Sequence, residues 1–261
     1  MINAKNIHDK LIQWIWEWFD RNGKDCNAVV GLSGGKDSTI CAALLAEALG
    51  KDRVIGVAMP DHNQGLNEAD EIAEYLGIRF MTAPIGTITR EFSNLWYTFH
   101  NEDFKWSEQT EQNIPPRVRM TMLYAIAQSF NGRVCCCDNA SENYLGYSTR
   151  WGDNVGDFSP IGALTVTELR ELGHYMEIPS KWVDKKPDDG LPHSKSDEEK
   201  FGFTYEELDK YIRKRELPDE KIRIKMDKRH WGSEFKRNSL LLPTFVPTNW
   251  DLEGITYYDN A

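Results

Sequence analysis

The strongest constraint on the fold is the alternation of short apolar runs with longer helical stretches in the first half of the chain. Four apolar runs are predicted to be buried strands: 28–32, 54–59, 79–83 and 134–137. Three intervening stretches have helical length and spacing: 37–49, 67–76 and about 115–130. Strands that alternate with helices form parallel sheets with both faces covered. We therefore expect an α/β fold in which a parallel sheet carries helices on both faces.

Two polar stretches are expected to be loops that become ordered when substrate binds. Residues 101–113 are polar and charged, and we expect them to form a loop before a helix whose first turn holds Pro115 and Pro116. Residues 184–199 are rich in Lys, Asp, Gly, Pro and Ser. A loop of that length is usually functional or disordered.

Charge and composition exclude several classes of protein. Forty per cent of residues are hydrophobic, which is enough for a sizeable core, and the net charge is −10, from 31 basic and 41 acidic residues. An acidic surface does not favour nucleic-acid binding. The first 25 residues carry several charges and no continuous apolar stretch, so neither a signal peptide nor a membrane span is expected. We expect a soluble, cytoplasmic protein.

The cysteines do not indicate a disulfide framework. There are five, an odd number, and Cys135, Cys136 and Cys137 are consecutive. Consecutive residues of a strand point to alternating faces, whereas a zinc site needs thiolates that converge. We therefore expect reduced thiols and no zinc site.

A glycine-rich loop between the first strand and the following helix is typical of a phosphate-binding site. It runs through Gly31, Leu32, Ser33, Gly34, Gly35, Lys36, Asp37 and Ser38. It is not a Walker A loop, because Asp37 follows Lys36 and Val30 stands where that pattern needs glycine. Glycines let backbone amides approach an anion, and the next helix presents its positive end. Asp37 would repel a bare phosphate, so it indicates Mg²⁺ bridging phosphate oxygens; a plain turn with Asp37 as helix cap is the alternative.

The segment Ser-Gly-Gly-Lys-Asp-Ser resembles the PP-loop of the ATP pyrophosphatases, which cleave ATP between the α and β phosphates and adenylate a substrate. Four further stretches resemble the ammonia-dependent NAD⁺ synthetases of that superfamily. These stretches are 113–125, 139–142, 146–160 and 186–211. The resemblance extends over nearly the whole chain and implies an adenine nucleotide α hydrolase-like, three-layer Rossmann-like fold, in one NAD synthetase domain spanning residues 1–261 without a glutaminase domain.

The resemblance also implies a role for particular residues. ATP would be bound by the loop from Gly31 to Ser38 and by the positions of Cys137 and Asp188, and Mg²⁺ by Asp37 and Glu142. Asp153 would orient ammonia, and Lys186 lies in the catalytic loop over the pyrophosphate. Four residues would contact nicotinic acid adenine dinucleotide (deamido-NAD): Arg117, Arg150, Asp157 and Lys236.

The chain departs from the family pattern at four positions. Val166 stands where many members have a lysine to the ATP phosphates, Cys137 where they have threonine, Asp188 where they have Ser or Thr, and Phe235 where they have His. Each change removes a polar contact worth about 1–3 kcal/mol. Lys185 or Lys186 would then supply the missing positive charge.

The expected activity is that of a C–N ligase. The deamido-NAD carboxylate would attack the α-phosphorus of MgATP, pyrophosphate would leave, and free ammonia would convert the acyl-adenylate to NAD⁺ and AMP. The resemblance also implies a homodimer that shares the dinucleotide site between subunits. Two alternatives stay open: another PP-loop enzyme, such as an amidotransferase or a tRNA-thiolating enzyme, and a nucleotide-binding regulatory protein without turnover.

Overall fold

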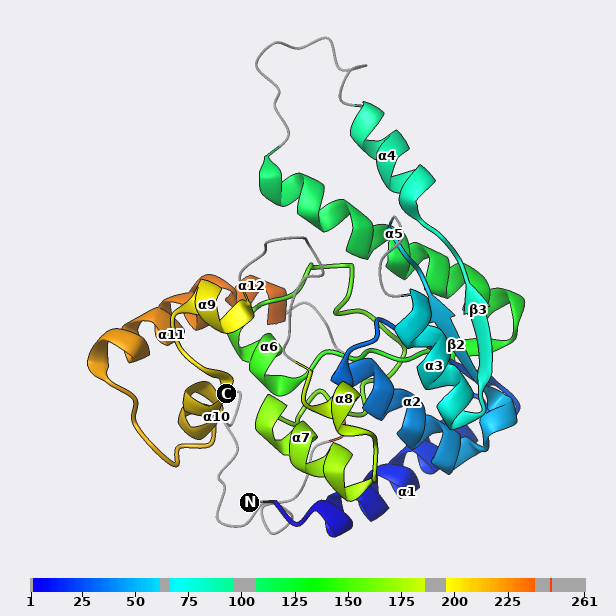
Figure 1. Cartoon of the computed structure of the whole chain (residues 1–261), viewed down its shortest axis with the longest axis horizontal. Helices are drawn as coiled ribbons and strands as arrows, with labels where there is room; N and C mark the ends of the chain where they lie inside the picture. The colour runs from blue at the N-terminus through cyan, green and yellow to red at the C-terminus, as the bar shows by residue number, and fades with distance from the viewer. Residues whose placement is uncertain (1, 62–65, 96–106, 186–195, 238–244, 246–261) are drawn as a thin grey trace.

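The computed structural model describes residues 2–61, 66–95, 107–185, 196–237 and 245 (Figure 1). Four parallel strands form one sheet in the order β3-β2-β1-β4. The strands are β1 (Asn27–Gly31), β2 (Val54–Ala58), β3 (Arg79–Thr82) and β4 (Gly132–Val134). Val29 at the centre of β1 pairs with Ile55 on one side and with Val134 on the other. The parallel sheet predicted from the sequence is confirmed.

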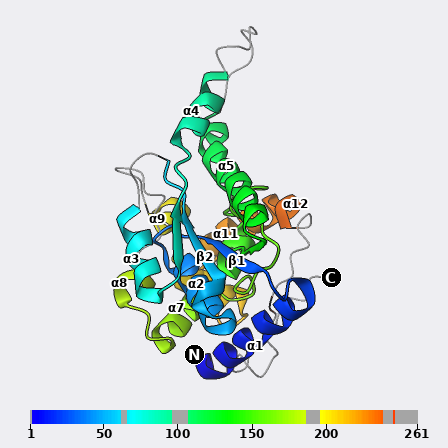
Figure 2. The ribbon, with the colours of Figure 1, turned by 90° about the vertical axis from the view of Figure 1, so that its right-hand side faces the viewer.

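Helices cover both faces of this sheet (Figures 1 and 2). One face carries α1 (Ala4–Asn22), α2 (Lys36–Leu49), α3 (Leu66–Leu76) and α7 (Val166–Tyr175), and the other carries α4 (Gly86–Asn94) and α5 (Glu108–Ser129). Side chains alternate along a strand, so Val30 joins the core with α1 and α2, whereas Val29 joins the core with α5. The expected three-layer α/β architecture is therefore confirmed.

The helix α5 begins earlier than the sequence predicts. Ser107 caps it by accepting a hydrogen bond from the Thr110 amide, and Pro115 and Pro116 lie inside the helix rather than in its first turn. The loop prediction was wrong for residues 108–113, and residues 101–106 lie outside the described part. Proline weakens a helix interior, but burial of Ile114 and Val118 against the sheet offsets this cost.

The fourth strand also differs from its prediction, since β4 ends at Val134 instead of running from Val134 to Cys137. The Cys135 amide still donates to the Val29 carbonyl at 2.9 Å, but the Cys136 amide donates to Phe158 O at 2.9 Å. The chain therefore leaves β1 at this point and pairs with the segment at 157–158.

A smaller group of helices packs beside the sheet around its own apolar cluster, which includes Tyr144, Val166, Phe201, Tyr205 and Met226. These helices are α6 (Ala140–Leu145), α9 (Asp197–Phe201), α10 (Tyr205–Ile212), α11 (Glu220–Gly232) and α12 (Glu234–Arg237). The short helices η1 (Lys51–Arg53) and α8 (Ser180–Val183) complete the described elements.

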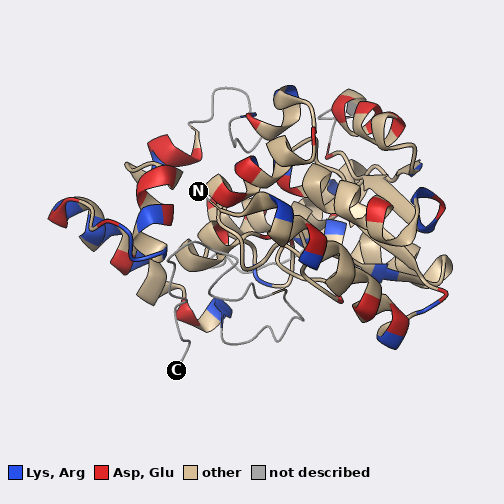
Figure 3. Ribbon diagram, turned by 90° about the horizontal axis from the view of Figure 1, so that it is seen from below, with Lys and Arg blue, Asp and Glu red and all other residues tan. Residues whose placement is uncertain are grey.

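The described elements carry charged residues of both signs. Figure 3 shows Lys, Arg, Asp and Glu spread over many of the elements. None of the described helices combines the length and apolar character needed to cross a bilayer.

Candidate functional site

The glycine-rich loop joins β1 to α2, where the backbone must turn sharply. Gly34 adopts a φ of +79°, and a Cβ at this position would lie 2.6 Å from Glu68 Oε2. Only glycine fits both restrictions. Gly35 is the N-cap of α2, so the proposal that Asp37 caps this helix is wrong; Asp37 lies in the first turn. The amides of this turn therefore point to the space above the loop.

Lys36 and Asp37 form a buried ion pair at the start of α2. Lys36 is 4% exposed, and its Nζ donates to Asp37 Oδ2 at 2.8 Å. Burial lowers the pKa of Lys36, but the negative charges of Asp37 and Glu142 outweigh burial and leave it raised. Asp37 Oδ1 is buried without a hydrogen-bond partner among the described residues. This carboxylate oxygen is therefore a candidate ligand for a cation.

Glu142 completes a pair of carboxylates at the same edge of the sheet. It lies in the first turn of α6, where it forms a capping box with Asn139. Burial raises the pKa of Glu142 to about 8, and the negative charges of Asp37 and Asp153 add to this rise. Mg²⁺ is bound in proteins by one or two carboxylates together with substrate phosphates. The donor atoms and the unpaired oxygen of Asp37 suit such an ion.

A buried hydrogen-bond network fixes the helix that carries Glu142. Asp209 of α10 accepts hydrogen bonds from Ser141 Oγ at 2.5 Å and from the Thr167 amide at 2.8 Å. Ser141 Oγ also accepts from the Val166 amide at 3.0 Å. One carboxylate therefore joins α6, α7 and α10 directly behind Glu142.

Asp209 is expected to make stability depend on pH. Burial raises its pKa from the usual 3.8 to about 6, although the hydrogen bonds from Ser141 and Thr167 oppose this. The folded state thus binds this proton more tightly, so the contribution of Asp209 is greatest below about pH 4 and is lost as the pH rises through about 6. In urea unfolding, the stability of wild type relative to Asp209→Asn should fall by up to about 3 kcal/mol over that range.

The exposed Asp219 at the cap of α11 offers a matched control for this experiment, because asparagine caps a helix equally well. Wild type and Asp219→Asn should keep a constant difference in stability across the same range. A constant difference for Asp209→Asn as well would contradict the assignment.

The loop at 149–153 holds Asp153 beside several cations. Asp153 Oδ1 accepts a hydrogen bond from the Thr149 amide at 2.7 Å. Lys236 Nζ donates to the Gly146 and Ser148 carbonyls at 2.8 Å each, and the charge of Asp153 acts on it. Arg117 Nε donates to the Arg150 carbonyl at 3.3 Å. One loop therefore brings together four residues that were predicted to bind substrates: Asp153, Lys236, Arg117 and Arg150.

Other predicted residues have different surroundings. Asp157 Oδ2 accepts a hydrogen bond from the Val134 amide at 2.7 Å, which ties it to the end of β4. Val166 is fully buried in the apolar cluster around Tyr144, and Phe235 is 58% exposed, with the Arg150 guanidinium 5.8 Å from its ring centroid. Lys186 and Asp188 lie outside the described residues.

Three charged residues near the loop were missed by sequence reasoning or only suggested by it. Lys185 Nζ contacts the Glu68 carboxylate and lies 3.5 Å from the Gly34 carbonyl, so it lies beside the phosphate-binding loop. Arg170 of α7 acts electrostatically on Lys36, and its Nε is buried without a partner among the described residues. Arg170 and Glu68 belong to no motif, although Arg170 lies one helical turn after Val166.

Comparisons with known proteins show which family the chain belongs to. The NAD synthase family model matches residues 7–238. An NH₃-dependent NAD⁺ synthetase from Methanococcus aeolicus is 37% identical over 215 residues, covering 81% of this chain and 83% of the relative.

Solved structures of related proteins superpose on nearly the whole chain. The NMN synthetase from Francisella tularensis has a TM-score of 0.81 and 31% identity, covering 93% of this chain and 99% of that one. The NH₃-dependent NAD synthetase from Campylobacter jejuni has a TM-score of 0.74 and 25% identity, covering 94% and 99%. The family match over most of the chain, together with the PP-loop and its two carboxylates, shows that this chain belongs to the NAD synthase family.

Proposed function

We propose that the chain is a ligase that makes NAD⁺ from deamido-NAD, ATP and free ammonia. The observation that carries this proposal is the position of Glu142, whose carboxyl group experiences the negative charges of both Asp37 and Asp153. The phosphate-binding loop and the loop expected to bind ammonia therefore both lie within electrostatic range of this residue. Adenylation and amidation need such proximity, because ammonia must reach the same carbonyl carbon that was adenylated.

The first half-reaction is assigned to the PP-loop. The triphosphate would be bound by the backbone amides from Ser33 to Ser38 and by the hydroxyls of Ser33 and Ser38. These two hydroxyl oxygens lie 3.2 Å apart. Lys36 would stay charged at this buried site and offset the charge of the departing pyrophosphate. Asp37 and Glu142 would hold Mg²⁺, which supplies Lewis-acid stabilisation of phosphate oxygens when bound. The substrate carboxylate would displace pyrophosphate from the α-phosphorus.

The second half-reaction is assigned to Asp153. Its Oδ1 is fixed by the Thr149 amide, so the carboxylate has a defined orientation toward the site. A carboxylate binds ammonium and accepts its proton, leaving neutral ammonia to attack the acyl-adenylate carbonyl. AMP then leaves and the amide of NAD⁺ is formed. Lys186 is assigned to bind the pyrophosphate, and its neighbour Lys185 lies beside Gly34.

The proposal also includes an oligomeric state and a cellular compartment. Arg117 is exposed, which suits an arginine that contacts the nicotinate of a dinucleotide bound across a dimer interface. We place the enzyme in the cytoplasm as a homodimer. Light scattering should give twice the chain mass, and a monomer at all concentrations would contradict the shared site.

Arg170 is expected to replace the lysine missing at position 166. Its buried Nε, which has no partner within the described part of the chain, and its electrostatic effect on Lys36 support a role with the ATP phosphates. Arg170→Ala should raise the KM for ATP by about 10- to 100-fold, because a hydrogen bond to a charged group contributes about 1.5–3 kcal/mol. Arg170→Lys should recover part of this affinity. The exposed Arg21 at the end of α1 is the control, and an equal KM in Arg21→Ala and Arg170→Ala would refute the role.

A product assay tests the proposed function against a second candidate. The likeness to the Francisella NMN synthetase favours nicotinic acid mononucleotide as the alternative acceptor. Each acceptor is incubated with MgATP and ammonium or glutamine, and the amidated product, AMP and pyrophosphate are quantified. Equal amounts of NAD⁺, AMP and pyrophosphate with ammonium alone are expected. A higher kcat/KM for the mononucleotide would favour the second candidate, and no AMP with either acceptor would refute both.

A further inference from the structure

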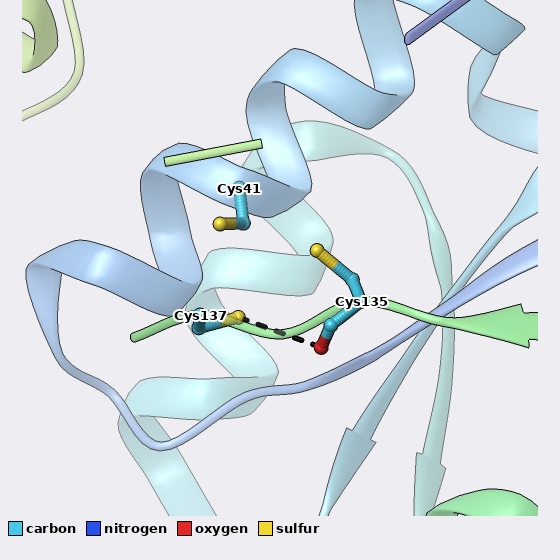
Figure 4. A group of neighbouring side chains, drawn as sticks. All are labelled: Cys41, Cys135 and Cys137. Carbon is cyan, nitrogen blue, oxygen red and sulfur yellow. Dashed lines mark hydrogen bonds between the residues drawn. The ribbon is translucent and has the colours of Figure 1, made fainter. Parts of the chain in front are cut away.

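Three cysteine thiols converge beneath the phosphate-binding loop from two separate parts of the chain. Cys41 comes from α2, and Cys135 and Cys137 come from the segment after β4, as Figure 4 shows. Their three Sγ atoms all lie within 4.8 Å of one another. Cys136, between the two, points away, as alternation along an extended segment requires. Alternation along the segment therefore holds for the three consecutive cysteines, but it leaves Cys135 and Cys137 on one face, where α2 supplies a third thiol that the sequence pattern did not indicate.

We propose that Cys41, Cys135 and Cys137 form a binding site for one Zn²⁺ ion. Zinc–thiolate bonds of about 2.3 Å place the sulfurs of a tetrahedral site about 3.8 Å apart, so the present triangle needs only a modest contraction. Three thiolates with one divalent ion leave a single negative charge. Three protein ligands with water at the fourth position is a common zinc arrangement.

The three cysteines differ in how far they are buried. Cys41 and Cys135 are buried at 0% and 3% exposure, whereas Cys137 is half-buried. Cys137 is thus the most exposed of the three, and the charge of Asp37 in the phosphate-binding loop acts on it. The partial exposure of Cys137 is the side from which we expect an ion and its fourth ligand to enter.

The thiols already interact with one another in a way that favours one thiolate. Hydrogen bonds from Cys135 and Cys41 lower the pKa of the Cys137 thiol, whereas burial raises the pKa of the other two thiols. Binding of Zn²⁺ would release the remaining thiol protons to solvent as the three Zn–S bonds form. No oxidant or reductant takes part in this step.

Zinc binding to the reduced protein tests the proposal directly. Competition with a chromophoric zinc chelator should give one equivalent per chain, and Cd²⁺ should produce the ultraviolet charge-transfer band of cadmium thiolates. Cys135→Ala and, separately, Cys41→Ala should weaken zinc binding by at least about 10- to 100-fold. Two variants are used so that a folding defect in one, detected by circular dichroism, leaves the other informative.

Two further variants separate this site from other sources of zinc affinity. Cys26 is buried before β1 and interacts with Asn131 Oδ1 at 3.4 Å, so Cys26→Ser should bind zinc as wild type does. Asp37→Asn should also keep its zinc and its cadmium band. Loss of zinc in Asp37→Asn with retention in Cys135→Ala would place the ion on the carboxylates and overturn the proposal. A disulfide between these cysteines in zinc-treated protein, detected as a loss of two hydrogens by mass spectrometry, would overturn it as well.

Discussion

Asp37→Asn is expected to abolish adenylation, with AMP formation falling by about 1,000-fold or more. The buried Oδ1 of Asp37 has no hydrogen-bond partner among the described residues, and burial together with the charge of Asp37 raises the pKa of Glu142. A divalent ion at this pair would supply that partner and favour the charged form of both carboxylates. Removing one charged ligand removes stabilisation of the charge that develops on pyrophosphate, which contributes several kcal/mol. Turnover of AMP under saturating MgATP measures the loss.

The substitution also breaks the buried ion pair with Lys36, so folding must be separated from chemistry. Glu142→Gln provides the second test, because Glu142 is not hydrogen-bonded to Lys36 and its backbone-capping oxygen is retained. Both variants should lose Mn²⁺ binding by calorimetry in the presence of ATP. The exposed Asp52 in η1 gives a matched control, and Asp52→Asn should retain wild-type turnover. Normal AMP formation by folded Asp37→Asn would remove the metal assignment.

The fold was predictable from sequence where local pattern and tertiary burial agree. The runs around Val29, Ile55 and Phe80 are short and apolar, and all three became parallel strands. The sequence pattern was misleading at Pro115, because the preference of proline for the first turn of a helix is only a local rule. The cap at Ser107 and the burial of Ile114 extend α5 toward its N-terminus. The predicted end of β4 was wrong because the Cys136 amide donates to the Phe158 carbonyl. A run of apolar residues does not reveal such a change of hydrogen-bond partner.

The site was predictable only for residues that lie in contiguous motifs. Gly34, Lys36 and Asp37 could be placed because a strand, a glycine-rich turn and a helix are adjacent in sequence. Arg170 and Cys41 could not, because their relation to the site depends on how α7 and α2 pack, and a single arginine or cysteine on a helix has no distinctive pattern. Tertiary contacts therefore supply what the motifs omit.

Asp153→Asn is expected to separate the two half-reactions. The backbone hydrogen bond from Thr149 can be kept by the asparagine oxygen, so the loop should retain its shape. The loss of the carboxylate removes the group that binds ammonium and accepts its proton, and general-base catalysis contributes about 10²- to 10⁴-fold. NAD⁺ formation should fall by that factor, whereas ATP–pyrophosphate exchange in the presence of deamido-NAD should continue.

This division distinguishes a general base from a residue that only shapes the loop. A purely structural role would lower exchange and amidation together, because both half-reactions use the same bound acyl group. Raising the ammonium concentration or the pH should partly restore NAD⁺ formation in Asp153→Asn, since free ammonia then needs no protein group to remove its proton. Asp219→Asn, which keeps its helix cap, should show neither the loss nor the rescue. If Asp153→Asn loses exchange as strongly as amidation, the residue belongs to adenylation and another group must take the ammonium proton.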